Sequence, residues 1–241
     1  MVTPGINELF FYTWTDHPAQ TFTTHAATIH TYPEHAALIQ ETVGLALTLR
    51  QDLFEKPIRL VIVPQTENFP PKAAYSYWKE TIYINTATLI THQALDQMHL
   101  LGWILNLLQH HAFTTLGDHL DRAVLERKIP AGILGPDDYV LHYTSRKNIK
   151  DFGDLMSEYL AETTRLIGQL NLPSRCSRSQ LNEYTKDAAW AIRSLRNILT
   201  RLPQVAPRVY TEVSPLNTFT LLRKNMKLLA QLVRDVKATP L

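Results

Sequence analysis

The side chains best suited to metal or acid–base chemistry are two adjacent histidines, His110 and His111, and two glutamates, Glu158 and Glu162. Imidazole and carboxylate groups bind zinc, and glutamates four residues apart share one face of a helix. Adjacent histidines on a helix point about 100° apart and cannot hold one ion together. A metal-dependent hydrolase would therefore use His110 or His111 with Glu158 and a third ligand that the sequence does not identify.

A second group of candidate residues is cationic, and we predict that it binds a partner. Residues 171–241 contain 12 lysines and arginines against 4 acidic residues, whereas residues 1–170 contain 12 against 18. This uneven distribution predicts a basic face that meets an acidic protein, an anionic surface or a nucleic acid. The residues predicted to bind the partner are Arg193, Arg196, Arg201, Arg223, Lys224 and Lys227.

The nucleic-acid hypothesis rests on charge alone. The sequence has no helix-turn-helix glycine turn, no aromatic RNA-binding strand motif and no glycine-rich phosphate loop. A protein partner is therefore the leading prediction, and nucleic-acid or anionic-surface binding through the C-terminal helices is an alternative.

The cysteine content and the apolar segments favour a cytoplasmic protein. Cys176 is the only cysteine, which excludes an intrachain disulfide and favours a reducing compartment. The first residues lack a basic segment followed by an apolar one, so we expect no secretory signal, although signal-less export stays open. The longest apolar stretch, Leu100 to Leu108, is shorter than the roughly 20 residues of a transmembrane helix.

The N-terminal half has the pattern of a small sheet backed by helices. A run of β-branched and apolar residues, Ile58 to Val63, predicts a central strand covered on both faces. Thr31, Pro33 and Glu34 predict the start of a helix that continues to about Phe54. Further strands are expected at Glu8–Thr13, Thr21–Ile29 and Thr81–Asn85, a loop at Pro64–Ala74, and a long buried helix at Thr91–Phe113.

The C-terminal half has the pattern of a helical bundle. We expect a short helix at Asp118–Arg127 and a loop at Ala131–Asp138 before three amphipathic helices. These helices should span residues 149–170, 179–202 and 215–237, with Pro203–Pro215 as a linker. The predicted fold class is α+β. An α/β part with a small mixed sheet spans residues 1–145, and a helical, basic subdomain at 146–241 packs on it to form one compact unit.

The element order of residues 30–165 resembles the N-terminal half of a zincin metallopeptidase. It consists of a helix, a buried strand, a proline-rich loop, a strand ending in Tyr83-Ile84-Asn85, and a long buried helix. In that family the buried helix carries His-Glu-x-x-His. In the gluzincin branch a later helix supplies a glutamate ligand, to which the Glu158 of Met156-Ser157-Glu158-Tyr159-Leu160-Ala161-Glu162 is similar.

This sequence departs from the zincin motif. If His111 is the second histidine of the motif, Leu107 stands in the place of the first histidine and Leu108 in that of the glutamate. If His110 is the second histidine, Asn106 and Leu107 stand in these two places. Leucine neither binds zinc nor takes a proton from water. We therefore predict no cofactor and no enzymatic activity, and a zincin-like scaffold that binds a protein, with the hydrolase as the alternative.

Overall fold

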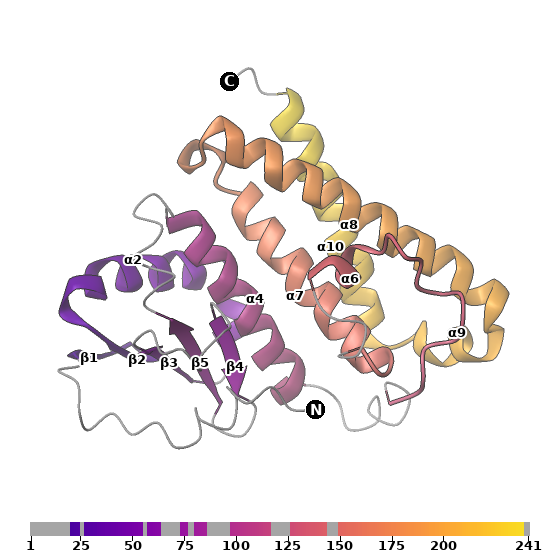
Figure 1. Ribbon diagram of the computed structural model, residues 1–241, viewed down its shortest axis with the longest axis horizontal. Helices are drawn as coiled ribbons and strands as arrows, with labels where there is room; N and C mark the ends of the chain where they lie inside the picture. The colour runs from indigo at the N-terminus through magenta and orange to yellow at the C-terminus, as the bar shows by residue number, and fades with distance from the viewer. Residues whose placement is uncertain are drawn as a thin grey trace. The chain divides into compact units, whose positions relative to one another are not determined.

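The strand predicted at the centre of the sheet lies there, as β3 (Ile58–Val63; Figure 1). All of its residues except Arg59 are buried, as expected of a strand that is covered on both faces. The computed structural model describes residues 20–24, 27–54, 57–63, 73–76, 80–85, 97–116, 126–143 and 149–238. The α+β class predicted from the sequence is confirmed.

The sheet is mixed and has the strand order β1-β2-β3-β5-β4. β3 pairs in parallel with β2 on one side and with β5 on the other, whereas the edge strands β1 and β4 are antiparallel to their neighbours. The remaining strands span Gln20–Thr23 (β1), Ala27–Thr31 (β2), Ala73–Ser76 (β4) and Thr81–Asn85 (β5).

Two strand predictions are wrong in detail. The single strand expected at Thr21–Ile29 is instead the antiparallel pair β1 and β2; Thr24 N donates to Ala27 O at 2.8 Å and Ala27 N donates to Thr24 Oγ1 at 2.9 Å. The end of the expected loop belongs to β4, which pairs with β5; Glu80, immediately before β5, has φ 46°. The strand predicted at Glu8–Thr13 lies outside the described residues.

Both helices predicted for the N-terminal unit are present, but the first ends five residues before its predicted end at Phe54. α2 spans Pro33–Leu49, and the 3₁₀ turn η2 follows at Gln51–Phe54. The predicted threonine cap is wrong, because Tyr32 is the N-cap residue and the Thr31 hydroxyl donates to the Tyr32 carbonyl oxygen. α4 spans Gln97–Leu116, one turn past the predicted end; residues 91–96 lie outside the described ranges.

The described residues divide into two compact units, 1–111 and 112–241, so the division lies N-terminal to the predicted boundary at 145/146. The segment between these two positions contributes Ile133, Tyr139 and Val140 to the core of the C-terminal unit. Its helices are α6 (Tyr139–Tyr143), α7 (Phe152–Leu170), α8 (Arg178–Val205), α9 (Pro207–Val213) and α10 (Asn217–Ala238), with the 3₁₀ turn η4 at Pro173–Arg175.

Helix α7 is the central element of the C-terminal unit. It packs against α10 and α8, which also contact each other (Figure 1). Fifteen of its nineteen residues are buried, among them the polar residues Glu162, Thr163 and Gln169. Asp151 caps its N-terminus by accepting a hydrogen bond from Asp154 N, and α8 begins with a capping box of Ser177 and Gln180.

Three expectations for the C-terminal half need correction. The predicted linker at Pro203–Pro215 is wrong, because Pro203 lies in the last turn of α8 and Pro207–Val213 form α9. The short helix α6 was not expected. Most of the helix predicted at Asp118–Arg127 lies outside the described residues, and its last residue instead precedes a β-bridge between Lys128 and Asp151.

No helix within the described ranges is both long and apolar enough to span a membrane.

The packing of α10 makes a first testable prediction. Leu222 is fully buried in the core of the C-terminal unit, so Leu222→Ala should lower the free energy of unfolding by about 2–5 kcal/mol. Thr220→Ala, at an exposed position of the same helix, should change it by less than about 0.5 kcal/mol. Urea denaturation of both variants measures the difference, and equal effects would show that α10 does not pack as described.

Candidate functional site

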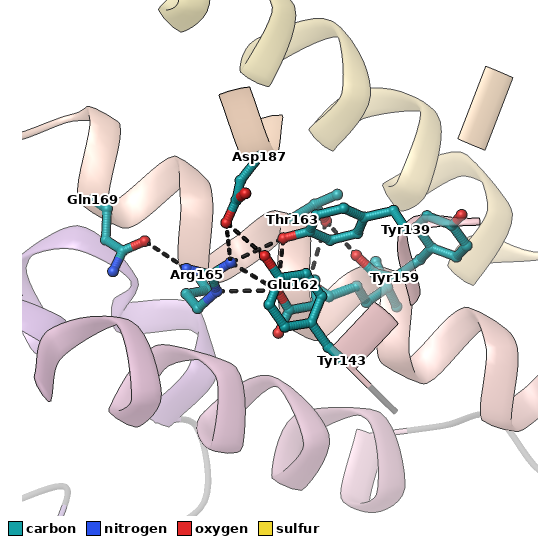
Figure 2. Close-up of polar contacts among 9 residues, drawn as sticks. Tyr139, Tyr143, Tyr159, Glu162, Thr163, Arg165, Gln169 and Asp187 are labelled. Atoms are coloured by element: carbon teal, nitrogen blue, oxygen red, sulfur yellow. Dashed lines mark hydrogen bonds and ion pairs between the residues drawn. The ribbon is translucent and has the colours of Figure 1, made fainter. Parts of the chain in front are cut away.

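A largely buried arginine, Arg165, whose side chain is 13% exposed, is at the centre of a polar cluster of the C-terminal unit (Figure 2). Its guanidinium donates to Glu162 Oε2 at 3.0 Å, Gln169 Oε1 at 3.0 Å and the Tyr139 hydroxyl at 2.9 Å. Asp187 Oδ2 lies 3.5 Å from the same guanidinium. The cluster therefore joins α6, α7 and α8, each of which contributes at least one side chain.

The two tyrosines of α6 complete the cluster. The Tyr139 hydroxyl accepts from Arg165 and donates to Glu162 Oε2 at 3.0 Å, and the Tyr143 hydroxyl donates to Asp187 Oδ2 at 2.7 Å. Burial raises the pKa of Tyr143 to about 12, and it raises the pKa of Tyr139 further. Although burial alone lowers the pKa of Arg165, the charge of Glu162 raises it above its usual value. These groups keep their protons at neutral pH, so their chemistry here is binding and positioning.

A neighbouring polar contact holds the segment before α6. The Tyr159 hydroxyl donates to both oxygens of Asp138, at 2.9 and 3.0 Å, while Asp138 Oδ1 accepts from Val140 N. Tyr139 N donates to Ser194 Oγ at 3.0 Å. Burial raises the pKa of Asp138. The carboxylate thus caps α6 and at the same time attaches it to α7.

Glu158, on α7, is a second carboxyl group of this unit whose pKa is raised. It lies one helical turn from Asp154 and one turn from Glu162 on α7. Burial, followed by the negative charges of Glu162 and Asp154, raises its pKa to about 7. The sequence predicted a shared face for Glu158 and Glu162, but it did not predict that Arg165 binds Glu162.

The histidines of the hydrolase hypothesis belong to the N-terminal unit, whereas Glu158 belongs to the C-terminal one. His111 is buried, and its Nδ1 lies 2.7 Å from the Tyr75 hydroxyl of β4. Burial lowers the pKa of His110 to about 4. Leu107 and Leu108 are buried, so the places of the first zincin histidine and of the glutamate do not fit a zinc site. Within the described residues, no three His, Cys, Asp or Glu side chains are grouped to hold a metal ion.

The cationic residues predicted to bind a partner lie on α8 and α10. Five of them are exposed and are called the basic surface below: Arg193, Arg196, Arg201, Lys224 and Lys227. None of the five makes an ion pair or side-chain hydrogen bond with another described residue. The sixth, Arg223, is half-buried; it donates to the Tyr210 hydroxyl at 3.2 Å and its guanidinium carbon lies 4.8 Å from the centre of the Phe219 ring.

Comparisons with known proteins give no relative: no protein-family model, no curated protein and no solved structure matches this chain.

Sequence reasoning missed the Arg165 cluster. The local part of a signal was present, because Glu162 stands three residues before Arg165 and Gln169 four residues after it, at spacings that share one face of a helix. The other partners come from residues 139 and 187, which are far from Arg165 in the sequence, and no local pattern connects them.

Removing the buried charge should unfold the cluster. Arg165→Met leaves the buried carboxylate of Glu162 without its cation, so the free energy of unfolding should fall by about 3–5 kcal/mol in urea denaturation. The double replacement Arg165→Met with Glu162→Gln should recover a large part of this loss, because no uncompensated charge remains at that pair. Losses that simply add would contradict the ion-pair explanation.

The raised pKa of Glu158 predicts a pH dependence of stability. The folded state keeps a proton up to about pH 7 that the unfolded state loses near its ordinary value of 4.5. The stabilisation is complete below the unfolded pKa and is lost as the pH rises through 7, so Glu158→Gln should gain roughly 1–3 kcal/mol relative to wild type between pH 5 and 8. Urea denaturation across this range is the measurement, with the exposed Glu183→Gln as control. Parallel curves for Glu158→Gln and wild type would disprove the shift.

Proposed function

We propose that this chain is a non-catalytic protein-binding module that binds an acidic protein through the basic surface of α8 and α10. The observation that supports this most strongly is the exposure of Arg193, Arg196, Arg201, Lys224 and Lys227 without ion pairs to other described residues. Exposed cations that are not neutralised within the chain attract an acidic partner and accelerate its association. Arg223 orders this part of α10 through Tyr210 and Phe219.

The N-terminal unit is proposed to be a zincin-like scaffold that has lost its metal site. The order helix, strand, strand and helix at 33–49, 58–63, 81–85 and 97–116 is the feature on which this resemblance rests. Buried leucines at 107 and 108 support the loss of catalysis, since neither can bind zinc or activate water. The metal-dependent hydrolase remains the second candidate, and Glu158, with its pKa near 7, is the residue that favours it.

Charge reversal on the basic surface tests the binding proposal. Proteins cross-linked to the full chain in host extract would be identified, purified and titrated against the chain. The variant Arg193→Glu/Arg196→Glu/Lys224→Glu/Lys227→Glu should then bind the purified partner at least about tenfold more weakly. The binding constant should also weaken as salt is raised, because exposed charges are screened.

Two controls separate this proposal from its rivals. Arg178→Glu/Lys186→Glu/Arg208→Glu/Lys237→Glu makes the same change in net charge at other exposed positions, and it should keep most of the affinity. Loss of the partner after nuclease treatment, with tight and steeply salt-dependent binding of duplex DNA or RNA instead, would replace the proposal with nucleic-acid binding. Chelator-sensitive hydrolysis of casein in the presence of zinc would establish the hydrolase.

A further inference from the structure

A cavity of about 230 Å³ lies beside the start of α7. Its apolar lining includes Ile129, Leu134 and Ile149, of which Ile149 is buried and the other two are half-buried. Lys128 and Lys150 line the same cavity and are both exposed. The cavity therefore combines an apolar wall with two ammonium groups.

The walls of the cavity are held by backbone hydrogen bonds. Lys128 and Asp151 form an antiparallel β-bridge, and Phe152 N donates to Arg127 O at 3.0 Å. The loop that contributes Ala131 and Gly132 to the lining has φ 81° at Gly132 and is anchored by the buried Ile133. A cavity with such walls exists before a ligand arrives, so binding does not have to order the chain.

The two lysines of the cavity are available to bind an external carboxylate. Neither Lys128 nor Lys150 makes a side-chain hydrogen bond or ion pair with another described residue. The neighbouring carboxylates are occupied by backbone amides: Asp151 accepts from Asp154 N at 2.9 Å, and Asp154 accepts from Lys150 N at 2.8 Å. Arg127 is paired with Glu212.

We propose that this cavity binds an apolar carboxylate, meaning a carboxylate attached to a body about as large as a leucine side chain. The volume of about 230 Å³ leaves room for a ligand of this size. The lysines attract the carboxylate, and the isoleucine and leucine walls remove the apolar body from water. Such a ligand is either the C-terminal residue of a peptide or a free short-chain acid.

Glycine-selective NMR of the full chain tests the proposal at the cavity itself. The chain has eight glycines, so ¹⁵N-glycine labelling gives few signals, and the Gly132 signal is identified by its loss in Gly132→Asn. Asparagine tolerates the positive φ of this position, so that variant should fold. Titration with 4-methylpentanoate, and separately with acetyl-Gly-Gly-Leu, should shift the Gly132 signal with a dissociation constant on the order of 1 mM.

Charge and volume are tested separately. The amides of both ligands should bind at least about fivefold more weakly, and so should the acids to Lys128→Gln/Lys150→Gln. Lys224→Gln/Lys227→Gln removes the same charge elsewhere and should leave the titration unchanged, whereas Ala131→Phe, at an exposed position of the lining, should fill the cavity and abolish the shift.

Comparison of the two ligands also distinguishes a free short-chain acid from the C-terminal residue of a peptide. A shift with both identifies the carboxylate and its apolar body as sufficient, and a shift with the peptide alone identifies a peptide C-terminus. No shift with either ligand up to about 20 mM would overturn the proposal. Equal binding of acid and amide, or unchanged binding by the lysine variant, would overturn it as well.

Discussion

The guanidinium of Arg165 carries a positive charge into the interior of the helical unit, and the elements around it are arranged to compensate that charge. Removing an ion from water costs several kcal/mol, which only close partners with good geometry offset. These partners are Glu162 and Gln169 on α7, Tyr139 on α6 and Asp187 on α8 (Figure 2). Because three helices must be in place before the charge is compensated, their packing is coupled.

In the same unit, neutral hydrogen bonds set the register between α7 and α10. The Asn225 side chain of α10 donates to Thr163 Oγ1 at 3.0 Å, and Thr163 Oγ1 in turn donates to Tyr159 O at 2.7 Å. Apolar burial stabilises α10 against α7 but has no direction. A buried amide, in contrast, finds its partner in one register, so this contact favours the observed alignment over a slipped one.

The sequence predicted those elements that depend on neighbouring residues and missed those that depend on contacts between distant ones. The strand Ile58–Val63 follows from a β-branched run and the start of α8 from amphipathic periodicity, and both predicted starts lie within a residue of the structure. Strand β4 depends on pairing with β5, and α9 on packing of Val213, so neither had a sufficient local signal. The Arg165 cluster and the cavity beside α7 combine residues distant in sequence, which no periodicity reveals.

Two kinds of cation in the C-terminal unit differ in what they can do. Arg165 is compensated on several sides and has little capacity left for an external ligand, whereas the cations of the basic surface face water. Arg193 and Arg196 lie three residues apart on α8, and Lys224 and Lys227 do so on α10. Like charges at this spacing repel and destabilise a helix by a few tenths of a kcal/mol per pair.

Within the described residues, no carboxylate offsets this repulsion on the basic surface. Local rules of stability are broken most often where a protein has a function to perform. An acidic partner would supply the missing negative charges and remove the repulsion at the same time. The repulsion between these residues is therefore itself an argument that the basic surface is a binding surface, and it favours a partner whose acidic groups reach both helices.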